Sequence, residues 1–355
     1  MIHVKPHIAA MPRYQPPWSD VDRSRYLRLD LNENTTQPPD HVEQALVEYV
    51  KTRRFSMYPE YGRFLEALAG YAGQPVERLM VTNGSDQAIE LLLRAFLGPG
   101  DTMLVAQPEF PIFSQVAGVI GAKVRGVPFT KDMAFPYEEF FAATKERPDL
   151  VVIINPNNPT GTPVDMEAIE RVARENPDTP VVVDEAYFEY TGATAAHLLD
   201  THDNVIVTRT FSKAFAMAGL RLGYLMARPE VIAELSKIRG PFDVNSPAMV
   251  AARAQIEQPL DWQSYVRECM DNSWPFLIRF FEELGVEYFP GSAHFLLVRP
   301  KNRDKAVEYL REHGVLVRPM FAPLIADTFR MCLGTLAQTR HFASVYEKFH
   351  ADFDK

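Results

Sequence analysis

The sequence has few cysteines, no excess of positive charge and no long apolar run. Its two cysteines among 355 residues, Cys269 and Cys332, lie far apart and show no metal-type spacing, so we expect a reduced, cytoplasmic setting without a disulfide framework. The formal net charge of −9 comes without a basic patch, which disfavours nucleic-acid binding. No apolar run approaches the roughly 18 residues that a membrane span needs.

Two further absences narrow the function. Residues 1–20 are interrupted by His, Lys and Pro and lack the continuous apolar core of a secretory signal peptide. The nine histidines form no compact metal-ligand spacing, so we expect no metal centre. Chemistry on a small molecule is therefore the favoured class of function.

The pattern along the chain predicts an α/β protein with a proline-rich arm over residues 1–40. From 41 to 245, helical patterns alternate with short runs that are apolar throughout, which is typical of parallel strands buried on both faces of a sheet. After 245, longer amphipathic segments (248–284, 302–313 and 337–353) and short strands at 293–300 and 314–319 predict a smaller α+β domain over 246–355. The apolar runs of the large domain are 79–82, 102–106, 150–154, 180–184, 204–208 and 222–227.

One helix of the large domain is expected directly after the first apolar run. Ser85 is a plausible N-cap, Asp86 falls in the first turn, and apolar residues recur with helical spacing up to position 96. The Gly98–Pro99–Gly100 sequence then predicts the helix end. The N-terminus of such a helix can bind an anion such as a phosphate.

Most of the notable polar residues follow an apolar run at once. Ligands of open α/β sheets bind beyond the carboxyl ends of the strands, so five strand ends should converge on one site. The residues in question are Asn83–Ser85, Pro108–Phe110, Asn155–Asn157, Asp184 and Thr210–Lys213.

Two nucleotide-binding alternatives lack their motifs. Asp184 could hold magnesium at a strand end, but the phosphate loop G-x-x-x-x-G-K-[ST] is missing. A dinucleotide site would need G-x-G-x-x-G after the first strand, which is also missing. A nucleotide-binding or regulatory module without covalent chemistry remains an alternative, and it would be colourless.

The stretch TRTFSKAFAMAGLRLGY (208–224) surrounds Lys213 with hydroxyls and small residues. A lysine forms a Schiff base only as the neutral amine, which requires a close, uncharged setting or a nearby cation. Pyridoxal phosphate needs such a lysine, an acidic partner for its pyridine nitrogen and an anion site for its phosphate. Lys213, Asp184, the predicted helix N-terminus and Arg221 supply this set.

Four motifs in order, VTNGSDQAIELLLRAF, NPNNPTG, VVVDEAYFEY and TFSKAFAMAGLRLGY, make the chain resemble fold-type-I pyridoxal-phosphate enzymes. The closest resemblance is to the histidinol-phosphate aminotransferase family, over roughly residues 30–335. It implies that Lys213 holds the cofactor as an internal aldimine and moves the proton during amino transfer. It further implies a set of cofactor contacts: Asp184 on the pyridine nitrogen, Asn157 and Tyr187 on the phenolic oxygen, Phe110 stacked on the ring, and Ser85, Asp86, Thr210, Ser212 and Arg221 on the phosphate.

The resemblance also implies the substrate site and a homodimer. Arg330 and Arg318 match anion-binding arginines, Asn34 belongs to the first loop over the substrate, and Tyr58 matches a tyrosine that reaches the phosphate of the neighbouring subunit. An amino donor and a 2-oxo acid acceptor, first of all histidinol phosphate and 2-oxoglutarate, would exchange by a ping-pong mechanism. An aromatic or broad-range aminotransferase and a decarboxylase of a phosphorylated amino acid remain alternatives.

The chain departs from the family's usual sequence at three places near the substrate. The first loop reads NENTTQPPD (32–40), Asp243 stands where Asn is usual, and His294 also replaces Asn. We expect Asp243 and His294 in the walls of the substrate pocket.

Overall fold

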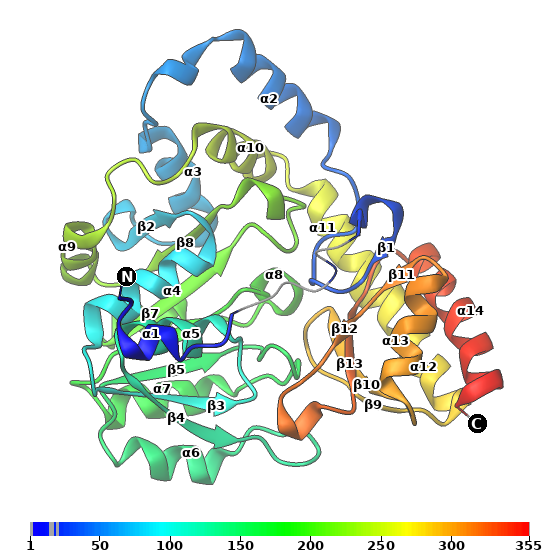
Figure 1. The fold of residues 1–355 in the computed structure, drawn as a ribbon. Helices are drawn as coiled ribbons and strands as arrows, with labels where there is room; N and C mark the ends of the chain where they lie inside the picture. Colours follow the sequence, from blue (N-terminus) through cyan, green and yellow to red (C-terminus); the bar gives the residue numbers. More distant parts are fainter. Residues whose placement is uncertain (1–2, 14–17, 19–20, 355) are drawn as a thin grey trace.

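The computed structural model describes residues 3–13, 18 and 21–354, and it has a large α/β domain and a smaller domain beside it (Figure 1). Part of the predicted arm (1–2, 14–17 and 19–20) and residue 355 lie outside the described residues. In the rest of the arm, α1 (Pro6–Ala9) packs against α5 (Ile112–Ile120) of the large domain. No described helix is long and apolar enough to cross a bilayer.

The large domain is built on a seven-stranded sheet with the strand order β2-β8-β7-β6-β5-β3-β4. Six strands run in one direction, and β8 is antiparallel to both of its neighbours. The sheet is therefore mostly parallel, as predicted, and the apolar run 222–227, which forms β8, departs from the parallel direction expected of these runs. The bounds are β2 Leu79–Thr82, β3 Thr102–Gln107, β4 Lys123–Pro128, β5 Leu150–Ile154, β6 Val181–Asp184, β7 Val205–Thr210 and β8 Gly223–Met226.

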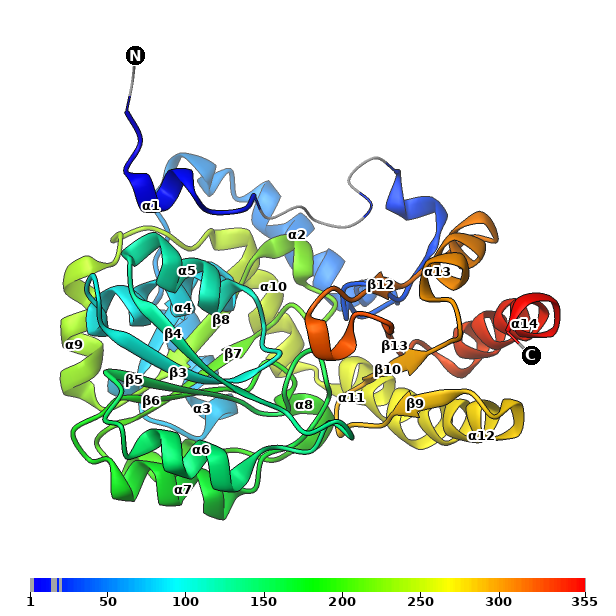
Figure 2. The ribbon, with the colours of Figure 1, turned by 60° about the horizontal axis from the view of Figure 1, so that its bottom comes forward.

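Alternate residues of the central strands enter two separate apolar cores, one on each face of the sheet. Val181 and Val183 of β6 pack into one core, whereas Val182 packs into the other. Burial on both faces, as expected from the runs, places helices on either side of the sheet (Figure 2). The edge strand β4 was not among the predicted runs because exposed polar residues interrupt its apolar ones.

The helices of the large domain follow the strands closely. The helix predicted after the first run is α4, but it begins at Gly84 with Asn83 as N-cap residue, so the assignment of Ser85 as N-cap is wrong. The helix ends at Phe96, just before the predicted stop. The other helices are α2 Asp40–Lys51, α3 Gly62–Ala72, α6 Tyr137–Thr144, α7 Met166–Glu175, α8 Phe188–Thr191 and α9 Pro229–Ile238.

The smaller domain contains a four-stranded antiparallel sheet with the order β12-β13-β10-β9. The predicted segment 248–284 divides into α10, which packs against α2 and α3 of the large domain, and α11 and α12, joined by a π-helical turn. The bounds are α10 Ser246–Glu257, α11 Leu260–Arg267, α12 Trp274–Leu284, β9 Glu287–Phe289, β10 Phe295–Arg299, α13 Arg303–Glu312, β12 Arg318–Pro319, β13 Phe329–Cys332 and α14 Leu336–Phe353.

A short parallel pair joins the beginning of the chain to its end. Strand β1 (Leu27–Arg28) pairs with β11 (Val315–Leu316), which is the first part of the strand predicted at 314–319. The chain then crosses from the smaller domain to the large one over residues 29–39 (Figure 1). This crossing segment forms one wall of the site described next.

Candidate active site

A cavity of about 500 Å³ lies between the carboxyl edge of the large sheet and strands β12 and β13. Residues of four of the five predicted strand ends line it, and the fifth strand end contributes Asn158 and Pro159 in place of Asn155–Asn157. Eleven of the predicted site residues line this cavity: Ser85, Asp86, Phe110, Asp184, Tyr187, Thr210, Ser212, Lys213, Arg221, Arg318 and Arg330.

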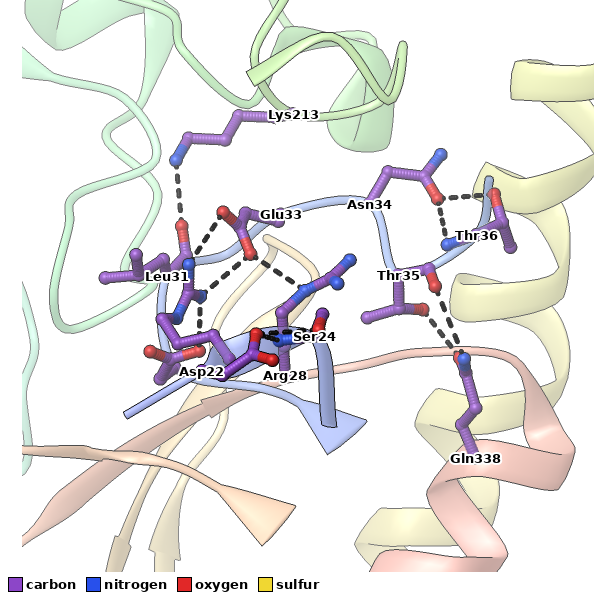
Figure 3. Close-up of polar contacts among 12 residues, drawn as sticks. Asp22, Ser24, Arg28, Leu31, Glu33, Asn34, Thr35, Thr36, Lys213 and Gln338 are labelled. Carbon is purple, nitrogen blue, oxygen red and sulfur yellow. Dashed lines mark hydrogen bonds and ion pairs between the residues drawn. The ribbon is translucent and has the colours of Figure 1, made fainter. Parts of the chain in front are cut away.

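Lys213 lies just after β7 with its amine facing the crossing segment. Its Nζ donates a hydrogen bond to the carbonyl oxygen of Leu31 at 3.0 Å (Figure 3). Burial, and after it the positive charge of Arg330, lower the pKa of Lys213 to about 8. A substantial fraction of the amine is therefore neutral near physiological pH, as a nucleophile requires.

Asp184 ends β6 at the floor of the cavity. It is buried, and its Oδ1 accepts a hydrogen bond from the Thr208 hydroxyl at 3.0 Å. Burial raises its pKa to about 7. A cationic nitrogen in the cavity would restore the ionised form, so this carboxyl suits a pyridinium partner.

Tyr187 is buried, and its hydroxyl receives two amide hydrogen bonds. Asn32 Nδ2 and Asn158 Nδ2 both donate to Tyr187 Oη at 3.0 Å. Burial raises the pKa of Tyr187 to about 12, so it remains a phenol. The hydroxyl retains its own proton to donate to an oxygen atom in the cavity.

The assignment of Asn157 to the cofactor oxygen stays a prediction, because its side-chain amide binds other groups of the protein. The Asn157 side chain donates to Pro108 O at 3.0 Å and to Thr160 Oγ1 at 2.9 Å, and it does not line the cavity. Its neighbour Asn158 lines the cavity and bridges Tyr187 to Arg330.

The start of α4 and Arg221 form a cradle for an anion. Gly84 has a φ of +75°, and an added Cβ would lie 2.6 Å from Arg221 Nη2, so a larger residue would close the cradle. Arg221 Nη1 donates to Ser212 Oγ at 3.3 Å. Arg221 Nη2 pairs with Asp86 at 3.0 Å, which leaves the backbone N–H of Asp86, not its carboxylate, as the group suited to a phosphate.

Arg318 and Arg330 face each other on the opposite wall. They are direct partners in the register of β12 and β13, which places two like charges side by side. Arg330 Nη2 donates to Asp30 O at 2.8 Å, and Nη1 donates to Asn158 Oδ1 at 2.5 Å. Within the described part of the chain, Arg330 Nε and Arg318 Nη1 are buried without a hydrogen-bond partner.

Besides Asn157, two predicted residues lie outside this cavity. Tyr58 is 74% exposed on the surface of the α2–α3 connection, and in the described chain it lines a different hollow. Asn34 is buried, and its amide donates to Ala214 O at 2.8 Å, directly after Lys213 in the chain. Asn34 therefore supports the site from behind and does not line it.

Asp243 and His294, which we expect in the walls of the substrate pocket, do not line this cavity. Asp243 is held by Arg239, whose Nη2 lies 2.6 Å from its Oδ1, and Gln87 Nε2 donates to Asp243 Oδ2 at 2.7 Å. His294 is buried, with its ring stacked on Tyr190 at 3.9 Å between centroids. Its ring also lies 5.7 Å from that of Tyr187, so it packs behind the site.

Sequence reasoning missed several residues of the site. Asn32, Leu31 and Glu33 come from the crossing segment, and their signal was the polar NEN after the alternating sequence LRLDL (27–31). Asn158 belongs to the NPNNPTG motif named above. The remaining wall, Met320–Ala322, follows β12 and had no polar signal.

The chain matches the family model of aminotransferase class I and II over residues 24–345. It is 34% identical over 351 residues to the histidinol-phosphate aminotransferase of Roseiflexus castenholzii, covering 93% of this chain and 94% of the relative. It superposes with a TM-score of 0.88 on the histidinol-phosphate aminotransferase of Sinorhizobium meliloti in complex with pyridoxal-5'-phosphate, at 24% identity over 98% of this chain and 99% of that one. L-threonine-O-3-phosphate decarboxylase of Porphyromonas gingivalis gives a TM-score of 0.80 at 25% identity, over 92% of this chain and 99% of that one.

The cavity fits the cofactor of this family. A buried carboxyl whose pKa is raised to about 7, an amine with a lowered pKa and an anion cradle surround the same space. These are the three groups that pyridoxal phosphate requires. The chain therefore belongs to the class I and II aminotransferases, enzymes that work with pyridoxal phosphate.

Proposed function

We propose that the enzyme transfers the amino group of histidinol phosphate to 2-oxoglutarate. In the reverse direction, glutamate is the amino donor. The observation that carries this proposal is the pairing of Arg318 with Arg330 across β12 and β13. The relatives that are 33–35% identical to this chain are named histidinol-phosphate aminotransferases, which supports the same substrate pair.

The arginine pair favours substrates that carry an anion at the end away from the amino group. Two like charges in register are unfavourable unless an anion binds between them. Guanidinium groups bind both phosphates and carboxylates with paired hydrogen bonds. The phosphate of histidinol phosphate and the distal carboxylate of glutamate can therefore use the same place in turn, which is what a ping-pong exchange requires.

Each side chain of the large-domain wall has a proposed task. Bound pyridoxal phosphate supplies an electron sink next to the carbon that bears the amino group. Lys213 Nζ takes a proton from that carbon and returns it to the cofactor side, which a lowered pKa allows. Asp184 keeps the ring nitrogen protonated, and Tyr187 Oη, oriented by Asn32 and Asn158, donates to the ring oxygen.

The remaining proposed contacts hold the cofactor in place. Phe110 packs on its ring. The cradle of Ser85, the Asp86 N–H, Ser212 and Arg221 binds its phosphate, and Thr210 fixes the turn by accepting a hydrogen bond from the Ser212 N–H at 3.1 Å.

We further propose that the enzyme is a homodimer in which Tyr58 reaches the partner's phosphate cradle. Tyr58 stacks on Phe242 at 4.3 Å between ring centroids, and both rings are largely exposed on one chain. Phe55 and Met57 beside them are also exposed. An apolar surface of this kind is typical of an interface, and a second copy would cover it.

Assays with three compounds test the substrate. The purified holoenzyme is given imidazole-acetol phosphate with glutamate, phenylpyruvate with glutamate, and threonine phosphate alone. We expect the first pair to turn over with a kcat/KM at least about 100-fold above the second, because only the first acceptor carries a phosphate for the arginines. Preferred turnover of phenylpyruvate, or release of carbon dioxide from threonine phosphate, would contradict the proposal.

A further inference from the structure

Within the crossing segment, residues 29–36 supply contacts to three groups of the active site although they have almost no regular structure. Figure 3 shows the first of these contacts, with Lys213. Leu31 O accepts a hydrogen bond from Lys213 Nζ, and Asn32 Nδ2 donates to Tyr187 Oη. Asp30 O accepts from Arg330 Nη2. Three consecutive residues thus set the position of the amine, the phenol and the substrate-side guanidinium.

Each end of this segment is tied to the smaller domain. At its start, Leu29 N donates to Leu316 O, and Cys332 N donates to Leu29 O. At its end, Thr35 Oγ1 donates to Gln338 Oε1 at 2.5 Å (Figure 3). The residues between these two attachments, 30–34, also contain two carboxylates, Asp30 and Glu33.

Arg23 contacts both carboxylates from the 3-10 turn Arg23–Arg25. Its Nη2 lies 2.9 Å from Asp30 Oδ1 and 2.9 Å from Glu33 Oε2, and its Nη1 lies 3.3 Å from Glu33 Oε1. One guanidinium therefore binds two carboxylates three residues apart, directly on either side of Leu31 and Asn32. A planar guanidinium holds two such partners in a fixed geometry, which a single ammonium cannot do.

The ion pair between Arg23 and Asp30 differs from a surface ion pair because Asp30 is buried. Its side chain is fully buried, and in the described chain Arg23 is its ion-pair partner while Oδ2 has no hydrogen-bond partner. Burial raises the pKa of Asp30, and Arg23 opposes that rise. Loss of Arg23 would leave a buried carboxylate uncompensated, which forces it to take up a proton or to move.

We propose that Arg23 is a positioning residue for amino transfer, which holds Asp30 and Glu33 so that the segment between them keeps its contacts with Lys213, Tyr187 and Arg330. This inference rests on the cavity being the amino-transfer site and does not depend on which acceptor is used. Arg23 itself does not line the cavity, so it would act through the residues that it holds.

The test compares Arg23→Gln, Arg23→Lys and Arg23→Gln/Asp30→Asn with the matched control Arg25→Gln, all as holoenzymes. Arg25 is an exposed arginine of the same turn. Three quantities are measured: the KM and kcat of the glutamate half-reaction, the pH midpoint of the visible absorption band, and hydrogen exchange of the peptide covering 29–36. The last two readouts need no amino donor, so a failure of the substrate proposal leaves them intact.

For Arg23→Gln we expect a KM for glutamate raised about 10-fold with kcat changed less, because Arg330 loses its support. The absorption midpoint should rise by about half a pH unit, because one positive charge leaves the surroundings of the bound cofactor. Exchange over 29–36 should accelerate. Arg23→Lys should recover KM to within about threefold, and Arg25→Gln should match the wild type.

A wild-type KM, midpoint and exchange rate in Arg23→Gln would overturn the proposal, even if that variant melted at a lower temperature. If Arg23→Gln does not fold, the double variant takes its place, because it carries no unpaired buried charge. The double variant should still show the raised KM and the faster exchange. Wild-type behaviour of the double variant would equally overturn the proposal.

Discussion

The two walls of the active-site cavity are built in different ways. The large-domain wall consists of residues that directly follow strands of one parallel sheet, so neighbouring strands bring them together. The opposite wall combines the crossing segment with β12 and β13, and it joins Asp30 to Arg330 from nearly the two ends of the chain. The first wall fits the cofactor that the family shares. We propose that the second wall binds the anionic group of the substrate.

The largest expected effect lies on the large-domain wall, at Lys213. Lys213→Ala should lower kcat by at least about 10³-fold, because it removes both the covalent attachment and the group that moves the proton. Stopped-flow measurement of the glutamate half-reaction gives the rate, and borohydride reduction followed by peptide mass analysis gives the attachment. The exposed Lys237→Ala variant should behave as the wild type. A reducible adduct that persists at the same site in Lys213→Ala would contradict the assignment.

Asp184→Asn should lower kcat by about 10²-fold or more, because an amide cannot keep the ring nitrogen protonated. The same substitution should stabilise the cofactor-free protein at high pH. The folded pKa of Asp184 is raised to about 7, above the ordinary value of 3.8, so folding favours the protonated form. The stability that this group contributes is fully present below about pH 4 and is lost as the pH rises through 7.

Urea unfolding of the cofactor-free protein at pH 4 and pH 8 measures this difference. At pH 8, Asp184→Asn should exceed the wild type by about 2–4 kcal/mol, and near pH 4 the two should agree. The exposed Asp352→Asn variant should show no pH-dependent gain. An equal difference at both pH values would show that Asp184 is ionised in the folded protein.

On the opposite wall, Arg330→Gln should act mainly on KM. We expect the KM for glutamate to rise about 10- to 100-fold, because the distal carboxylate loses its paired hydrogen bonds. Lys213 and its acid–base chemistry remain, so kcat should fall less than in Lys213→Ala. Steady-state kinetics at saturating and low glutamate separate the two parameters, with the exposed Arg340→Gln as control. A fall in kcat alone would show that Arg330 acts in the chemical step, as the residues of the large-domain wall do, and not in substrate binding.

The two neighbouring asparagines give a sharper contrast within one loop. Asn158→Ala should lower kcat/KM about 10-fold and shift the pH midpoint of the visible band, because its amide contacts both Tyr187 and Arg330. Asn157→Ala should lower the melting temperature and leave the midpoint unchanged, because its amide contacts Pro108 and Thr160. The reverse pattern would support the prediction that Asn157 contacts the phenolic oxygen of the cofactor.

The smallest effect is expected at Tyr58, where Tyr58→Phe should weaken cofactor binding only a few-fold through one lost hydrogen bond. Mixed dimers of Lys213→Ala and Tyr58→Ala chains provide the stronger measurement. If Tyr58 acts on the partner, each mixed dimer contains one intact site, so mixing should raise activity above that of either parent. Activity equal to the average of the parents would show that Tyr58 acts within its own chain or not at all.

The difference between the walls also explains what sequence alone could predict. Lys213, Asp184 and Ser85 each follow an apolar run, and the parallel sheet aligns such positions whatever the loops do. The reversed direction of β8 could not be predicted, because a strand that is buried on both faces has the same apolar pattern in either direction. Asn157 and Asn158 could not be told apart, because an irregular loop has no period that fixes which side chain faces the cavity.

No sequence motif could have predicted the role of Arg23 either. Its partners Asp30 and Glu33 are seven and ten positions away along an irregular segment, so no helical or strand spacing joins them. Likewise, the pairing of β1 with β11 involves two-residue strands that carry almost no pattern. Contacts between distant short segments are the part of this fold that required the structure.

The pairing of β1 with β11 has a consequence for synthesis of the chain. The large sheet and Lys213 can be complete while residues 315–332 are still inside the ribosome, because folding during translation proceeds from the N-terminal side. The crossing segment can reach its final conformation only after β11 and Arg330 have emerged from the ribosome, because β11 pairs with β1 at its start and Arg330 donates a hydrogen bond to Asp30 O. A nascent chain therefore carries its reactive lysine before the opposite wall of the cavity is finished, and that wall forms only after the C-terminal residues have emerged.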